Sequence, residues 1–105
     1  MANGLEDRKN HEDKWALDED QRFKATARRN KLLGLWAAEL LGLAGDEAAA
    51  YAKTVVASDF AEPGEEDVFR KVKKDLADKG VADDVIRRKM AELTVTAREQ
   101  IVAGS

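Results

Sequence analysis

An unbroken segment from Arg22 to Leu43, RFKATARRNKLLGLWAAELLGL, constrains the fold of this chain more than any other feature. It contains no proline, and its basic first half passes directly into an apolar second half, so it predicts one long helix. The basic half, which should face water or a partner, contains Arg22, Lys24, Arg28, Arg29 and Lys31. The apolar half, which should be buried on several sides, contains Leu32, Leu33, Leu35, Trp36, Leu40 and Leu41. We expect this helix to be the most buried member of the fold.

The rest of the chain is also typical of helices. Its 105 residues are enough for a single core, and they include one proline, few β-branched runs and much Ala, Glu, Lys and Leu. The sequence therefore predicts an all-α fold, a compact four-helix bundle over 20–105 that follows a mobile, helix-capable N-terminal arm over 1–19. The predicted helices are at about 20–43, 46–61, 65–79 and 83–102.

Glycines and acidic residues mark the expected ends of these helices. The first helix should begin near Asp18 to Asp20 and stop at Gly42 or Gly45, and Asp46 should cap the second, which Pro63 and Gly64 end. Apolar residues at helical spacing predict the buried stripes of the last two helices. These are Val68, Phe69, Val72 and Leu76 in one, and Ile86, Met90, Leu93, Ala97 and Ile101 in the other.

Gly34 lies inside the first predicted helix. A glycine there costs about 1 kcal/mol relative to alanine, so a close approach by another helix is the expected reason for it.

Several classes of function find no support in the residues. Without cysteine there is no thiolate ligand or nucleophile, and the one histidine, His11, reads as a solvated side chain. The acidic pairs fit helix starts better than acid–base catalysis. The longest apolar run is too short to span a bilayer, and residues 1–10 do not resemble a secretory signal. We expect no enzyme activity, no metal and no direct membrane insertion, and a cytoplasmic protein.

The basic half of the first helix leaves two interpretations open. With a net charge of −3, the chain has no general attraction for nucleic acid, and only Phe23 interleaves the basic residues for base stacking. A face for protein partners is favoured over a nucleic-acid adapter. The arm before it has only Leu5, Trp15 and Leu17 as large apolar residues, so it should be mobile alone and fold against a partner.

Three further segments accompany the 22–43 block. They are EAAAYAKTVVASD at 47–59, Glu62-Pro63-Gly64, and the closing IRRKM at 86–90 with AREQI at 97–101. Together they resemble the alphaproteobacterial zeta subunit of F-type ATP synthases, the ATPase inhibitor of that enzyme. The most specific part is RRNKLLGLWAAELLGL, from Arg28 to Leu43.

The resemblance implies a regulator that inhibits ATP hydrolysis and spares synthesis. Its arm would insert as a helix into the catalytic sector, among the alpha, beta and gamma subunits, and block rotation, on the cytoplasmic face of the inner membrane. The arm positions implied to bind are Leu5, Asp7, Arg8, Lys9, Lys14, Trp15, Asp18 and Glu19, with a basic stem face at Arg22, Lys24, Arg28 and Arg29. No cofactor is implied beyond weak adenine nucleotide binding on the body, at no identifiable site.

The arm departs from the family pattern. Family members carry two phenylalanines where this chain has Asn10-His11 and Trp15, and the stretch is one residue shorter here. The deletion of one residue rotates the preceding part of a helix by about 100°, so we expect Leu5 and Trp15 not to share the binding face of the family, and inhibition to be weak. The alternative is a helical nucleotide-sensing or adapter protein without inhibitory activity.

Overall fold

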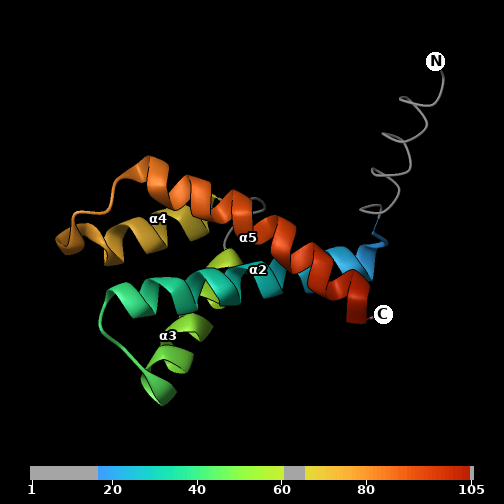
Figure 1. Ribbon diagram of the computed structural model, residues 1–105, viewed down its shortest axis with the longest axis horizontal. Coiled ribbons are helices and arrows are strands. Elements are labelled where there is room, and N and C mark those ends of the chain that lie inside the picture. Colours follow the sequence, from blue (N-terminus) through green and yellow to red (C-terminus); the bar gives the residue numbers. More distant parts are fainter. Residues whose placement is uncertain (1–16, 61–65, 105) are drawn as a thin grey trace.

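The computed structural model describes residues 17–60 and 66–104, and these residues form four α-helices with two short 3-10 turns and no strand. The elements are α2 (Glu19–Leu40), α3 (Gly45–Ala57), η1 (Ser58–Phe60), α4 (Glu66–Asp75), η2 (Ala77–Lys79) and α5 (Asp83–Gly104). Figure 1 shows α2 between α3 and α5, with α4 folded back beside α5. The prediction of an all-α, four-helix fold is confirmed.

The predicted start of α2 is built by Asp18. Its carboxylate accepts a hydrogen bond from the Gln21 backbone N–H at 2.7 Å, and the Gln21 side chain accepts one from the Asp18 N–H at 3.1 Å. This reciprocal pair satisfies two donors that a helix start leaves open, and Glu19 and Asp20 complement the positive end of the helix dipole.

One core lies between the helices. Its buried members are Leu33, Ala37, Val55, Val68, Phe69, Val72, Leu76, Ile86 and Met90. The predicted stripes of α4 and α5 supply most of these side chains, and Trp36, Leu41 and Leu93 pack partly buried against them. Leu35 and Leu40, however, are exposed, so their predicted burial is wrong. Leu35 lies about 200° round the helix from Leu33, and Leu40 is the last residue of α2, beyond its packing partners.

Gly34 is the point of closest approach between α2 and α3. A Cβ atom built on it would lie 2.6 Å from the Cα and 3.1 Å from the Cβ of Ala52. Both residues are buried, and the closest atom belongs to the backbone of Ala52. No rotation of a side chain could therefore make room for a Cβ at position 34. The prediction of a close helix contact at this glycine is confirmed.

The end of α2 follows the predicted glycine signal. Gly42 has φ +81°, and the N–H groups of Gly42 and Leu43 donate to the carbonyls of Glu39 and Ala38 at 3.1 and 2.9 Å. These two hydrogen bonds close the last turn of the helix, with Gly42 in the left-handed region of backbone conformation. Residues that carry a Cβ adopt this conformation at a cost, so a glycine is favoured here.

The boundaries of α3 differ from the prediction. The helix begins at Gly45 with Ala44 as its N-cap and no side-chain cap, so Asp46 lies in the first turn and the expected capping role is wrong. The helix ends at Ala57, where the Ser58 Oγ donates to the Val55 carbonyl at 2.6 Å and the chain tightens into η1. Pro63 and Gly64, expected to end it, lie outside the described residues.

Polar contacts fasten α4 to its neighbours. The Tyr51 hydroxyl of α3 donates to the Asp75 carboxylate at 2.8 Å, and the Lys71 ammonium lies 2.8 Å from the same carboxylate. Partial burial, together with this carboxylate, raises the pKa of Tyr51 well above its ordinary value. Burial opposes ionisation of Asp75, but the hydrogen bonds from Lys71 and Tyr51 outweigh it and lower its pKa.

A second set of contacts joins α4 to α5. Arg87 holds both oxygens of Glu66, at 3.0 and 3.1 Å, and its guanidinium lies 3.7 Å from the centroid of the Phe69 ring. Lys73 pairs with Asp83 at 3.0 Å. These contacts hold the α4–α5 pair against the core at the end opposite to the N-terminal half of α2.

Candidate functional site

The predicted arm residues fall into two groups. Leu5, Asp7, Arg8, Lys9, Lys14 and Trp15 lie outside the described residues. Asp18 and Glu19 are described, and they belong to the start of α2, where Asp18 is the N-cap. Leu17, directly before them, is buried. The four-helix body therefore includes the last residues that the sequence assigns to the arm.

The stem basic face lies on the N-terminal half of α2. Arg22, Lys24 and Arg28 are exposed, as is Lys31. Lys24 pairs with Asp20 at 3.1 Å, and Arg28 Nη1 donates to Gln100 Oε1 of α5 at 2.7 Å. The predicted charged surface is thus present at these four positions.

Arg29 was expected on this face, but it is only 5% exposed, so its predicted solvent-facing position is wrong. Its Nε donates to Asn30 Oδ1 at 2.6 Å, and its Nη1 donates to the Thr94 hydroxyl of α5 at 3.3 Å. A buried guanidinium needs acceptors for its donors, and the neighbouring side chains provide them. Arg29 is therefore part of the α2–α5 contact.

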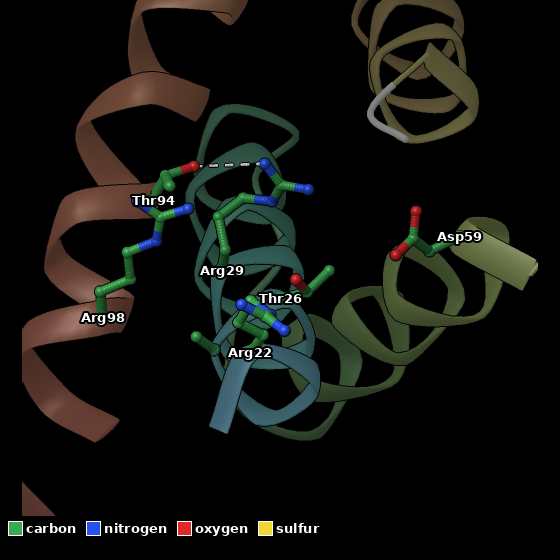
Figure 2. A pocket seen from close by; sticks show the side chains of 7 residues that line it. Arg22, Thr26, Arg29, Asp59, Thr94 and Arg98 are labelled. Atoms are coloured by element: carbon green, nitrogen blue, oxygen red, sulfur yellow. Dashed lines mark hydrogen bonds between the residues drawn. The ribbon is translucent and has the colours of Figure 1, made fainter. Parts of the chain in front are cut away.

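Three arginines line a pocket between α2, η1 and α5 (Figure 2). The cavity has a volume of about 220 Å³ and is lined by Arg22, Ala25, Thr26, Arg29, Asp59, Thr94 and Arg98. In Figure 2 the Asp59 carboxylate lies across the pocket from Arg98. The lining carries three guanidinium groups and one carboxylate, and this excess of positive charge favours an anionic ligand. We refer to this cavity as the arginine pocket.

A second hollow lies on the stem basic face. It has a volume of about 400 Å³ and is lined by Phe23, Lys24, Ala27, Arg28, Lys31, Val56 and Ile101. Phe23 is 67% exposed, the most exposed large apolar side chain among the described residues. The lining of this hollow combines apolar side chains with three basic ones. We refer to the hollow as the Phe23 groove.

The sequence showed only part of these two sites. Arg22, Thr26 and Arg29 follow one another at spacings of four and three, as do Thr94 and Arg98 at four, so each set shares a helix face. Nothing in the sequence indicates that the α2 and α5 faces meet, or that Asp59 joins them. Ile101 likewise belongs to a predicted buried stripe, although it also lines the groove.

No helix in 17–60 or 66–104 has the length and apolar character needed to cross a membrane. In the same ranges, no group of three or more His, Cys, Asp or Glu side chains is arranged so that it could hold a metal ion.

These features define a small helical protein whose surface carries an arginine pocket and a basic apolar groove, the kind of sites that bind anions and protein segments. The chain belongs to the family of ATPase inhibitor subunit zeta, because the model of that family matches residues 1–100. The assignment that the sequence motifs indicated is thus confirmed.

A solved structure is similar to this chain in sequence and fold. It is described as the solution NMR structure of a protein, it is 51% identical to this chain and it superimposes with a TM-score of 0.73. The match covers 80% of this chain and 98% of that one. The comparison with curated proteins returned no match. Family membership makes the chain a regulatory protein with an ATPase inhibitor role, whose partner is the F-type ATP synthase.

Proposed function

We propose that this chain inhibits ATP hydrolysis by inserting its N-terminal arm as a helix into the catalytic sector of the ATP synthase, where it blocks rotation. The arm would contact the alpha, beta and gamma subunits through Leu5, Asp7, Arg8, Lys9, Lys14 and Trp15. The observation that carries the proposal is that the model of the ATPase inhibitor subunit zeta family matches residues 1–100, a range that includes the arm.

The structure of α2 supports a role as the stem of the arm. A block to rotation must bear a mechanical load, so the inserted segment needs a rigid connection to a body. The helix that begins at Glu19 runs without a break to Leu40, whose preceding turns are buried in the core. Hydrogen bonds from Arg28 to Gln100 and from Arg29 to Thr94 also brace it against α5. Force on the arm would therefore reach the whole body.

The inhibition should depend on the state of the enzyme. An arm that becomes helical only when bound pays ordering entropy at that step, so its affinity is sensitive to whether the cleft is open. Rotation in the hydrolytic direction would close the cleft on the arm, whereas rotation in the synthetic direction would release it. The chain would thus act on the cytoplasmic face of the inner membrane through the enzyme, with no membrane insertion of its own.

A truncation tests this proposal. The fragment 17–105 lacks the arm but keeps Leu17 and the Asp18 cap. The four helices of the body should therefore keep their helical circular dichroism signal and a cooperative thermal unfolding transition. We expect it to lose inhibition of ATP hydrolysis by the isolated cognate catalytic sector, where the full chain inhibits. Deleting 1–19 is a poorer choice, because it also removes the cap of α2. Undiminished inhibition by the fragment 17–105 would disprove the role of the arm.

The arginine pocket favours a second function, binding of an adenine nucleotide through its phosphates. Three guanidinium groups and the Thr26 hydroxyl around about 220 Å³ suit a phosphate chain, while the volume is too small for the whole nucleotide. The base and ribose would therefore lie outside the pocket. Such binding would make the body a sensor of nucleotide level, in addition to any inhibitory activity.

Amide chemical shifts test the nucleotide site. ATP and inorganic pyrophosphate should both shift the amides of Thr26 and Thr94, adenosine should not, and Arg98→Gln should weaken the ATP effect. Arg88→Gln, on an exposed part of α5 away from the pocket, is the matched control. Shifts spread over the surface in both variants, or no shift with ATP, would rule the site out.

A further inference from the structure

Phe23 is exposed in a position where burial would be favourable. It lies on the N-terminal half of α2 and forms, with Ala27, Val56 and Ile101, the apolar floor of the Phe23 groove. A phenylalanine with 67% of its surface in water is a typical anchor for a protein partner, since aromatic side chains dominate the centres of interfaces. The groove has room for one large side chain of the occupant.

A buried side-chain donor lines a small cavity that Phe23 also lines. Asn30 is 1% exposed, and its Oδ1 accepts from Arg29 Nε, which assigns the amide nitrogen to the other position. That Nδ2 has no hydrogen-bond partner among the described residues. Asn30 lines a small cavity of about 60 Å³ that shares Phe23, Ala27 and Val56 with the groove. A buried donor is costly to leave unpaired, so this position suits an acceptor oxygen brought by an occupant.

The charge around the groove selects the occupant. Its lining contains Lys24, Arg28 and Lys31 and no acidic side chain. Lys24 pairs with Asp20 at 3.1 Å, and Asp59 lines only the small cavity around Asn30, so Arg28 and Lys31 supply most of the positive charge. Arg28 donates to the neutral amide of Gln100, so that contact does not cancel its charge. The whole chain has a net charge of −3, which makes this basic rim a local exception. An acidic occupant is therefore favoured over a neutral or basic one.

The position of the groove links it to the arm. Figure 1 places the N-terminal half of α2 beside the C-terminal end of α5, and residues of both helices line the groove. Phe23 follows Leu17, the first described residue after the arm, by six positions. An occupant held in the groove would keep the root of the arm against the same partner, so that insertion of the arm becomes an intramolecular step.

From these observations we infer that the Phe23 groove is the surface by which the body docks on the ATP synthase. Its occupant is an acidic segment of the catalytic sector that carries one large apolar side chain. The apolar side chain packs on Phe23, and a neutral carbonyl oxygen beside it accepts from Asn30 Nδ2, because Asp59 in the same small cavity would repel a carboxylate. This inference rests on the proposed function for the identity of the partner. The chain's own arm is a poorer occupant, because residues 1–16 contain four acidic and three basic side chains and so lack a strong negative charge.

Two matched alanine variants of the full chain test the groove. Phe23→Ala removes the anchor and should weaken binding to the isolated catalytic sector at least tenfold in Kd. Val95→Ala removes a side chain that is 50% exposed on α5 outside the groove, and it should change Kd less than twofold. Because Phe23 is largely exposed, both variants should keep the helicity and melting temperature of the native chain. At saturating concentration the Phe23 variant should still inhibit fully.

The buried donor has its own variant. Asn30→Asp keeps an acceptor for Arg29 but replaces the Nδ2 donor with an oxygen, so docking should weaken beyond the twofold range of the control. An unchanged Kd for a folded Asn30→Asp chain would overturn the hydrogen bond to the occupant.

A photoreactive benzoylphenylalanine at position 23 of the full chain identifies the occupant. We expect a cross-link to an acidic, apolar-anchored segment of the catalytic sector, and none from position 95. Cross-links to residues 1–16, to a second copy of the chain, or to vesicles of phosphatidylserine instead of the enzyme would overturn the inference.

The results separate this inference from the proposed function. If the native chain binds and inhibits while Phe23→Ala has the same Kd, the groove is not the docking surface and the function stands. If the native chain neither binds nor inhibits, both fail.

Discussion

Replacing Gly34 by alanine sets two effects of opposite sign against each other. On an isolated helix the change would stabilise the protein by about 1 kcal/mol, because alanine is the better helix former. In this protein the new Cβ would lie 2.6 Å from the Cα of Ala52, whereas ordinary contact begins at 3.4 Å. The obstacle is backbone, so rotation of a side chain cannot relieve it.

The two helices would therefore have to separate by nearly 1 Å. A gap of 0.5–1 Å loses about a quarter to a half of the attraction between facing atoms. The affected contacts include Leu33, Ala37 and Val55, which are fully buried. Overpacking of this kind typically costs about 1–3 kcal/mol, and the rigid neighbour places Gly34→Ala at the upper end. After the gain in helix propensity, we expect a net loss of about 1–2 kcal/mol in unfolding free energy.

Urea denaturation followed by circular dichroism measures this change. Ala49→Gly, at an exposed position of α3, gives the local scale of helix propensity and should cost about 1 kcal/mol. Adding Ala52→Gly to Gly34→Ala should not restore stability, because the clashing Cα remains. If Gly34→Ala raised the unfolding free energy by about 1 kcal/mol, the close approach would not be a constraint on this residue.

Three further changes test the contacts around α4. Tyr51→Phe removes the hydrogen bond to Asp75 and should lower the unfolding free energy by about 1 kcal/mol at neutral pH, as read from urea midpoints. Since the folded pKa of Asp75 is lowered, its stabilising contribution is present above its ordinary pKa and disappears as the pH falls through the folded value. The stability difference between the native chain and Asp75→Asn should thus shrink on acidification from pH 6 to pH 3, and a constant difference would contradict the ion pair. Gly80→Ala places a Cβ at φ +69° and should cost about 1 kcal/mol by thermal melting, although nothing lies near the new atom; no loss would show that the turn has relaxed.

Helix positions and their buried stripes followed from the sequence because they depend on local periodicity. Asp18 and Gly42 perform the predicted roles at the ends of α2, and Gly34 meets another helix as expected. In each case the signal is a backbone requirement that few residue types satisfy. The prediction that Asp46 caps α3 was wrong because α3 begins one residue earlier, at Gly45. Residues that can act as N-caps are common near helix starts, so the presence of one does not fix the first residue of a helix.

The sites depended on how helices are placed against one another, which periodicity does not give. Arg29 has the spacing of a surface residue, but α5 covers it and supplies Thr94 as an acceptor. The arginine pocket and the Phe23 groove each combine side chains from separate helices, and the sequence shows only which of these residues share a face of one helix. The family resemblance pointed to the arm as the inhibitory segment, and its residues before Leu17 remain a prediction.

The central claim is that the arm physically blocks rotation of the catalytic sector. Single-molecule observation of ATP-driven rotation, with the full chain or the fragment 17–105 added at equal concentration, tests it most directly. We predict long pauses at one fixed rotor angle with the full chain, ended by forced rotation in the synthetic direction, and none with the fragment. Uniformly slowed rotation without fixed-angle pauses, or equal pauses with both proteins, would contradict the account.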